Sequence, residues 1–485
     1  MASISSTGSV SSAGIGSGLD VAGIVSKMMD VEKAPLTLLQ AQASDISTKI
    51  SAFGALKSAM SAFRDAANAL TLPSAWSATT ATSADASIAS GTTTSGGTAG
   101  NYAVTVSSLA TAQAVATGAF ANSTALVGAG TMHIDLGTWA AAPANSFTAK
   151  SGSTGLDITV GATDTLSDVR DKINAAGAGV NASIVTDLSG SRMVLTSTNT
   201  GTDNGFRVTA QDADGNNADA TGLSALAYDP QNSTTGTSRT QSAGNANATI
   251  NGLPVSSATN KLTGVIQGLD ITLGKVSATP VQITVGQDNT AIKGSISNFV
   301  TAYNALSTLL TTDTKYDKTT TTAGPLQGDS TAVSMQRQLR NIISASTSAS
   351  SVFGSLSQVG LEVQKDGTLK INDTKLTASL GNLAEVKKLF SSNAGNDPSN
   401  YGIAQKMGTL GNSMLNTGGL LVTRNTGLNT TLAANGKRQT DMQSRLDATE
   451  SRLKAQYTAL DTKMASLTTL STYLTQQIAG WNKNT

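Results

Sequence analysis

The last fifty residues carry the most regular pattern in the sequence. Apolar side chains recur there in steps of three and four, the spacing of a stripe along one face of a continuous helix. The stripe consists of Met442, Leu446, Thr449, Leu453, Tyr457, Leu460, Met464, Leu467, Ser471, Leu474, Ile478 and Trp481. A doubled four-residue step from Leu453 to Tyr457 is a stutter, which locally unwinds a coiled coil. The pattern predicts a C-terminal coiled-coil arm over residues 431–485.

A second helical stripe lies near the start of the chain. Asp20 has the sequence context of a helix N-cap, because apolar residues follow it at helical spacing, and Pro35 suits the first turn of a further helix. From there the stripe continues through Leu39, Ala43, Ile46, Ile50, Phe53, Leu56, Met60, Phe63, Ala67 and Leu70. Residues 1–13 are Ser-rich and lack periodicity, so we expect a flexible N-terminal arm over residues 1–42.

Two apolar stripes at opposite ends of one chain need partners. They can pack against each other, or against copies of themselves in neighbouring subunits. Core packing in a globular helical domain is the more common role of such stripes, but the length of the C-terminal stripe favours an intermolecular coil. We expect the two stripes to form a helical leg and the interface between subunits. The expected residues of this oligomer and leg interface are Ile46, Ile50, Phe53, Met60, Phe63, Leu446, Leu453, Tyr457, Leu460, Met464, Leu467, Leu474 and Ile478.

The middle of the chain has the alternating pattern of β-strands. Apolar and polar residues alternate in runs that turn residues bound, and these runs centre on Val104, Ile134, Ile158 and Val208. One helix is expected over residues 165–176, since Thr165 and Asp168 have the spacing of a capping box. The segment 180–197 that follows is expected to form a hairpin. The helical period returns near Asp288.

These patterns predict an α+β multidomain fold, because 485 residues are too many for one hydrophobic core. N- and C-terminal helices form a coiled-coil or helical-bundle leg, and β-rich head domains are inserted between them. The expected parts are a flexible N-terminal arm (1–42), a helical leg domain (43–77 with 277–430), a β-rich head domain (78–108 with 235–276), a second β-rich head domain with one helix (109–234) and a C-terminal coiled-coil arm (431–485).

The sequence offers little catalytic chemistry. GIGSGLD at residues 14–20 lacks the G-x-G-x-x-G spacing and the preceding strand of a dinucleotide loop, and we interpret it as a hinge before a capped helix. His133, the single histidine, shares a strand face with Asp135 but has no nucleophile motif nearby, as expected of a surface histidine. QDADGNNAD at residues 211–219 lacks the distal Glu of a calcium loop. We interpret it as a polar turn, with weak calcium binding as the alternative, and predict no catalytic, cofactor or metal site.

Charge and cysteine content exclude further classes. The chain has 32 basic and 31 acidic residues, a net charge of +1, which gives no long-range field to attract nucleic acid. It has no cysteine, which excludes disulfides, thiol nucleophiles and cysteine-ligated metals. No apolar run approaches the ~20 residues that span a bilayer, and the first 30 residues do not resemble a cleaved signal peptide. We expect neither nucleic-acid binding nor membrane insertion.

Several segments together resemble one protein family. They are GIGSGLDVAGIVSKMMDVEKAPL, ISNFVTAYNAL, GPLQGDSTAVSMQRQLR, GTLKINDTKLTASL and the C-terminal ESRLKAQYTALDTKMASLTTLSTYLTQQI. These are similar to the flagellar hook-associated protein 2 family, the filament caps of bacterial flagella. TLSDVRDKINAAGAGVNASIV with SRMVLTSTNTGTDNGF resembles a motif that flagellins, hook-junction proteins and caps share. One departure is that Arg452 precedes Leu453, where cap sequences often have an Arg-Tyr pair.

The resemblance implies a non-enzymatic protein of flagellum assembly at the extracellular tip of the filament, exported by the flagellar type III apparatus without a cleaved signal peptide. Several copies would form a plate from their β-rich heads, with legs built from the two chain ends, and flagellin would fold and insert beneath it. The implied partners are further copies of the chain, flagellin, the hook-filament junction protein and a flagellar export chaperone. The alternatives are another axial flagellar protein (a hook-junction or filament subunit), an extracellular adhesin, or an enzyme that uses His133 and Asp135.

Overall fold

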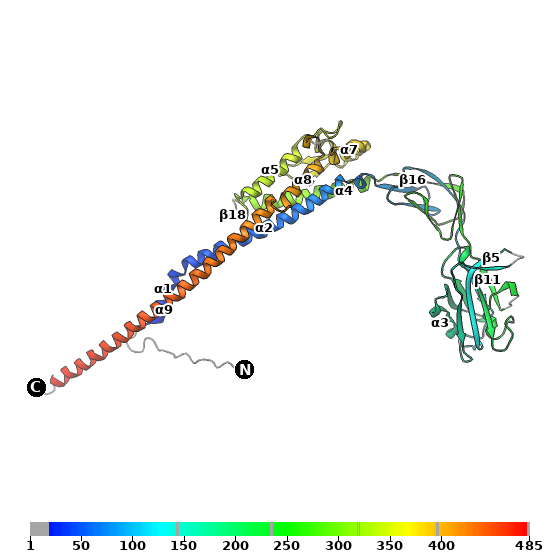
Figure 1. Cartoon of the computed structure of the whole chain (residues 1–485), viewed down its shortest axis with the longest axis horizontal. Helices are drawn as coiled ribbons and strands as arrows, with labels where there is room; N and C mark the ends of the chain where they lie inside the picture. Colours follow the sequence, from blue (N-terminus) through cyan, green and yellow to red (C-terminus); the bar gives the residue numbers. More distant parts are fainter. Residues whose placement is uncertain are drawn as a thin grey trace. The chain divides into compact units, whose positions relative to one another are not determined.

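The chain is divided into two compact units. The computed structural model describes residues 19–141, 145–232, 236–317, 319, 321–393 and 397–482. Unit 1 is built from the chain up to residue 76 and from residue 292 onwards, and unit 2 comprises residues 77–291. Helices at both ends and a β-rich middle confirm the predicted α+β multidomain class (Figure 1).

Unit 1 is mostly helical. Its helices are α1 (Val21–Glu32), α2 (Ala34–Thr71), α4 (Asn289–Thr314), α5 (Ser330–Ser344), α6 (Asp373–Ser379), α7 (Leu383–Ser391), α8 (Ile403–Leu415) and α9 (Leu420–Asn482). Two small hairpins join them, β17 (Tyr316–Asp317) with β18 (Thr322–Ala323) and β19 (Leu361–Val363) with β20 (Leu369–Ile371). As predicted, the Asp20 carboxylate caps α1 by accepting a hydrogen bond from the Gly23 amide at 2.8 Å. Pro35 lies in the first turn of α2.

Two expected parts of the chain do not coincide with the helix bounds of unit 1. Residues 21–32 and 34–42 of the expected flexible N-terminal arm lie in α1 and α2, as Asp20 and Pro35 predict; α1 is capped, and Val21, Val25 and Met29 bury their side chains. The helix α9 is continuous across residue 431, so the arm does not begin there as a separate element.

Aromatic side chains fill the core of unit 1. The Phe63 ring lies 5.4 Å from the ring of Phe299 and 5.7 Å from that of Tyr303, while Phe390 contacts Phe299 and Trp76 at 6.2 Å and 5.6 Å. The Tyr303 hydroxyl donates a hydrogen bond to the Gly367 carbonyl at 3.0 Å, and burial raises the pKa of this hydroxyl. These contacts join α2, α4 and α7 into one core.

Unit 2 contains antiparallel sheets around two hydrophobic clusters. The first cluster lies between a sheet in the order β1 (Thr79–Ser83), β16 (Ser277–Gln287), β3 (Gly100–Ser108), β12 (Ala246–Ile250), β13 (Leu253–Ser257) and a sheet in the order β14 (Lys261–Ile266), β15 (Leu269–Leu273), β2 (Ala89–Thr93). The segment from 277, expected in the leg, is a strand because Val281, Ile283 and Val285 are buried and alternate with exposed residues, and Ile283 and Val285 lie in this cluster.

The second cluster of unit 2 has one helix and two further sheets. One sheet joins β10 (Gly205–Asp212), β5 (Gly130–Trp139), β6 (Phe147–Ala149) and β7 (Leu156–Val160), and the other has the order β11 (Thr237–Gln241), β4 (Ala114–Thr117), β9 (Gly190–Ser197), β8 (Val180–Asp187). The helix α3 (Leu166–Ala176) has the predicted capping box of Thr165 and Asp168. The predicted hairpin is formed by β8 and β9, which pair from Val180 with Ser197 to Asp187 with Gly190.

Candidate assembly surface

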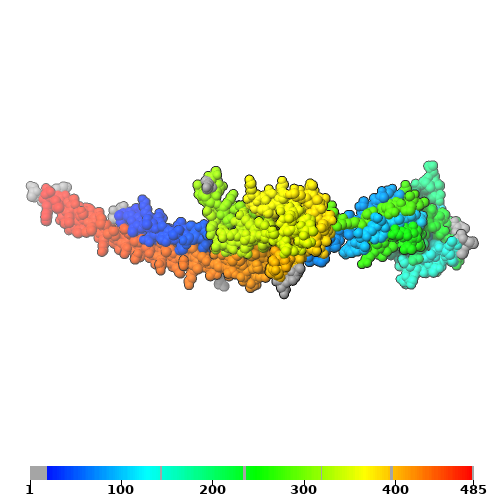
Figure 2. All heavy atoms as spheres, turned by 90° about the horizontal axis from the view of Figure 1, so that it is seen from above, coloured from blue at the N-terminus to red at the C-terminus, as the bar shows by residue number. Residues whose placement is uncertain are grey.

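The two terminal stripes meet in unit 1, where α9 packs antiparallel to α2 and α1. The guanidinium of Arg424 lies 5.9 Å from the centre of the Phe53 ring, Gln439 donates a hydrogen bond to the Leu39 carbonyl at 3.4 Å, and the Tyr457 hydroxyl lies 3.5 Å from the Met28 sulfur. Residues further along α9 therefore contact residues earlier in the chain on α2 and α1, as in an antiparallel arrangement. Figure 2 shows the blue N-terminal helices beside the orange part of α9.

The predicted interface residues of α2 face the interior of unit 1. Phe53, Met60 and Phe63 are no more than 1% exposed, and Ile46 and Ile50 are half-buried. The first three form the core of the leg within one chain and offer no free surface to a neighbouring subunit. Their part in an interface is therefore internal to the leg.

Three predicted residues of α9 belong to a small cluster with α1. Leu446 and Leu453 pack with Val21, Val25 and Met29, and Tyr457 lies against this group. The chain thus uses one of the alternatives left open by its sequence, in which the stripes of the two ends cover each other. This α1 cluster ends at Tyr457.

Beyond Tyr457 the stripe of α9 is exposed. Figure 1 shows the end of α9 continuing past α1, and the exposed fractions of the predicted residues lie between 45% and 59%. We define the terminal stripe as Leu460, Met464, Leu467, Leu470, Leu474, Ile478 and Trp481, which are all exposed. Leu470 is not part of the predicted stripe, but it broadens the apolar face at helical spacing, and Tyr473 is also exposed.

Polar contacts fix the packing of the part of α9 that precedes the α1 cluster in the sequence. Asp329 caps α5 by accepting hydrogen bonds from the amides of Thr331 and Ala332, and it pairs with Arg424 of α9 at 2.6 Å. The buried Asn435 accepts a hydrogen bond from Gln439 at 2.6 Å. Gln439 also donates a hydrogen bond to the Leu39 carbonyl of α2 at 3.4 Å, so this polar contact links α9 to α2.

His133 in unit 2 is part of a charged cluster. Its Nδ1 lies 2.5 Å from Asp157 Oδ1 and its Nε2 lies 3.0 Å from Asp135 Oδ1, and Arg207 pairs with Asp135 at 2.8 Å. The hydrogen bond with Asp157 is the main cause that raises the pKa of His133. Burial would raise the pKa of Asp135, but hydrogen bonds from Arg207 and His133 outweigh it and lower that pKa. With both ring nitrogens engaged by carboxylates, the imidazole is placed as a cation between strands rather than as a general base.

The acidic loop at residues 211–219 uses its side chains within the turn. Asp212 accepts a hydrogen bond from the Ser224 amide at 2.9 Å, and Asp219 accepts one from the Ser224 hydroxyl at 2.5 Å. Across the residues that the structure describes, no group of three or more His, Cys, Asp or Glu side chains is arranged to hold a metal ion.

Residues 14–18 of GIGSGLD lie outside the described residues. In the described part of the chain, no helix combines the length and apolar character that crossing a membrane requires.

Comparison with known proteins identifies the family. Residues 17–113 match the description "Flagellar hook-associated protein 2 N-terminus", residues 243–469 match "Flagellar hook-associated protein 2 C-terminus", and residues 146–199 match "Flagellin hook IN motif". Flagellar hook-associated protein 2 of Escherichia coli K12 is 33% identical over 97% of this chain and 98% of its own length. The chain belongs to the flagellar hook-associated protein 2 family. The predicted resemblance is thereby confirmed.

Members of the flagellar hook-associated protein 2 family share both sequence and fold with this chain. The B-type flagellar hook-associated protein 2 of Pseudomonas aeruginosa is 32% identical over 96% of this chain and 97% of its own length. The crystal structure of the D1-D2-D3 domains of the flagellar cap protein from E. coli matches with a TM-score of 0.58 and 29% identity, over 78% of this chain and 99% of that one. The fold of this chain is thus similar to that of a protein described as a flagellar cap protein. The hook IN match spans α3 and the hairpin of β8 and β9, where the sequence resemblance to flagellins was found.

Proposed function

We propose that this protein forms the cap at the distal tip of the flagellar filament, as a homo-oligomer, and promotes the folding and insertion of exported flagellin. The terminal stripe is the observation that carries the proposal. Its seven apolar side chains lie on one helix and are between 45% and 74% exposed, and burying each half-exposed side chain would contribute about 1 kcal/mol. An apolar face of this length marks an interaction site.

The sequence identity to flagellar hook-associated protein 2 of E. coli and to its P. aeruginosa counterpart supports a role in the flagellum. The further partners in this proposal are flagellin, the hook-filament junction protein, an export chaperone and the type III export apparatus. The chain would reach the tip by that route. The near-neutral charge, 32 basic against 31 acidic residues, suits subunits that must shift against their neighbours, since no strong long-range field fixes one arrangement.

Charged substitutions in the terminal stripe test the proposal. Leu460→Asp with Leu467→Asp is expressed in cells that lack their own cap gene, and we expect no filaments by electron microscopy and flagellin monomers in the medium. Thr462→Asp with Thr469→Asp is the matched control, because these residues lie about 180° to 200° around α9 from Leu460. The control should restore filaments. Both purified variants should keep the helical circular dichroism of the parent protein.

Two results would contradict the proposal. Filaments of normal length in the Leu460→Asp, Leu467→Asp variant would remove the terminal stripe as the assembly surface. Gold labelling of an epitope on the parent protein that appears along the shaft, or at the base, would identify a filament or junction subunit instead of a cap.

A further inference from the structure

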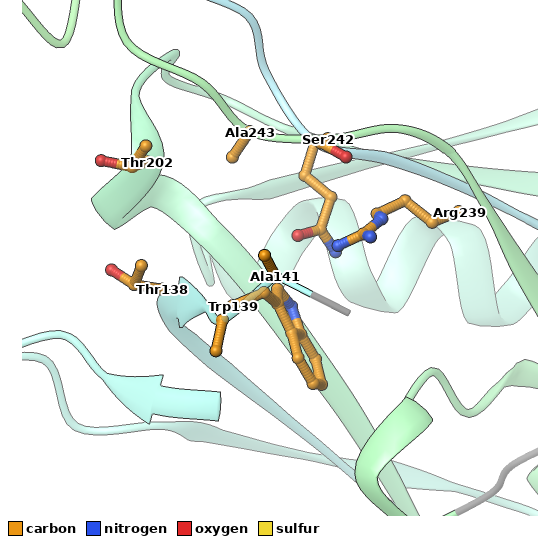
Figure 3. A pocket seen from close by; sticks show the side chains of 9 residues that line it. Thr138, Trp139, Ala141, Thr202, Arg239, Ser242 and Ala243 are labelled. Carbon is orange, nitrogen blue, oxygen red and sulfur yellow. The ribbon is translucent and has the colours of Figure 1, made fainter. Parts of the chain in front are cut away.

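Unit 2 contains a pocket of about 340 Å³ whose chemistry the proposed cap role does not use (Figure 3). Its walls come from β5, from the segment that begins at Thr202, and from β11 with the residues after it. The lining side chains that matter here are Gln113, Thr138, Trp139, Thr202, Arg239 and Ser242. The volume lies within the range of pockets that bind small molecules.

Most of the polar wall is held in place by the protein itself. The buried Gln113 donates to the Phe206 carbonyl at 2.7 Å and accepts from the Phe206 amide at 3.2 Å. The indole nitrogen of Trp139 donates to the same carbonyl at 2.9 Å, so the indole presents only its apolar surface to the pocket. Its ring is further fixed by Phe147 at 4.9 Å. The wall is therefore preorganised.

Arg239 in this wall is not held in this way. Its side chain is exposed and, among the described residues, it has neither an ion-pair partner nor a side-chain hydrogen bond. The pairing of β11 with β4 is irregular between Arg239 and Gln241, and such bulges re-aim side chains. Figure 3 shows the guanidinium directed toward the same space that Trp139, Thr138 and Thr202 surround.

We propose that this pocket binds a monosaccharide-sized sugar acid, with its pyranose ring against the Trp139 indole and its carboxylate on the Arg239 guanidinium. A guanidinium recognises a carboxylate through paired hydrogen bonds, and an indole face suits the apolar C–H surface of a sugar ring. The oxygens of Thr138 and Thr202, whose hydrogens go to Asp203 at 3.0 Å and Asn245 at 3.2 Å, remain acceptors for sugar hydroxyls. A neutral sugar offers no carboxylate to the Arg239 guanidinium, and a purely apolar acid offers no hydroxyl to the threonine oxygens.

Binding to the purified full-length protein tests this site, with D-glucuronate as the probe and saturation-transfer NMR with calorimetry as the readouts. We expect saturable binding of glucuronate that weakens about tenfold or more in Arg239→Gln, because one charge-assisted contact is lost. Glucose and benzoate should bind at least about tenfold more weakly than glucuronate. Arg170→Gln is the matched control, since Arg170 is a surface arginine on α3 that pairs with Asp171, and it should bind like the parent.

Each contrary result overturns a defined part of the proposal. Absence of saturable glucuronate binding, or unchanged binding in Arg239→Gln, removes the site. Equal binding of glucose refutes the role of the carboxylate, and equal binding of benzoate refutes a sugar as the ligand. The measurement uses no filament, so its failure is distinct from failure of the proposed cap function.

Discussion

Leu453→Ala should release the N-terminal helix α1 without unfolding the rest of unit 1. Leu453 is 9% exposed and joins Leu446 in holding Val21, Val25 and Met29 of α1. Truncating a buried Leu to Ala costs about 2 to 5 kcal/mol, and a partly exposed site in a small cluster belongs at the lower end, about 2 to 3 kcal/mol. Since about 1.4 kcal/mol corresponds to a factor of ten, the closed state of α1 should lose roughly 30- to 150-fold in its equilibrium constant.

Native-state hydrogen exchange measures this effect directly. Amides of α1 should lose protection by that factor in Leu453→Ala, or all protection if α1 is held by less than the energy removed, while amides of α4 keep theirs. Leu460→Ala is the matched control, because Leu460 is 45% exposed and lies outside the α1 cluster. Unchanged protection of α1 in Leu453→Ala, or an equal loss in Leu460→Ala, would refute the packing argument.

Two further predictions concern carboxylates of unit 1. Hydrogen bonds from Lys388 first and Ser350 second lower the pKa of Glu385 from 4.5 to about 2. The contribution of Glu385 to the stability of the folded protein is therefore complete above pH 4.5 and is lost as the pH falls toward 2. The difference in melting temperature between the parent and Glu385→Gln should shrink over that interval, and a constant difference would contradict this prediction. Asp329→Ala should unfold more easily in urea than Asp329→Asn by about 1 kcal/mol, because Asn keeps the N-cap of α5, and equal midpoints at equal slopes would show that the cap contributes nothing.

Features encoded over a few residues could be predicted from the sequence. The Asp20 cap, the capping box of Thr165 and Asp168, and the hairpin of β8 and β9 each depend on neighbours within one or two turns. The stripe of α4 was predicted near Asp288 for the same reason, and its apolar residues from Ile292 to Leu310 are buried. Local spacing determines such elements because their hydrogen bonds are local.

Contacts between distant segments could not be predicted in the same way. The sequence indicated His133 with Asp135, but Asp157 and Arg207 join them only because β7 places Asp157 opposite His133 and β10 places Arg207 opposite Asp135. The helical spacing after Asp20 predicts α1, but nothing nearby shows that Leu446 and Leu453 would cover it. The same limit applies to the apolar stripes of the two chain ends. Their spacing predicts that each packs against another helix but does not say which helix.

The pairing of β1 with β16 has a consequence for how this gene can vary. These strands open and close unit 2, and they run side by side from Thr79 with Gln287 to Ser83 with Ile283. The chain therefore leaves the helices and returns to them at points roughly 5 Å apart. A short turn, or an unrelated domain whose two ends lie close together, could be inserted at this junction without changing the distance between α2 and α4. Recombination could accordingly replace everything between the two strands while the helical framework stays the same.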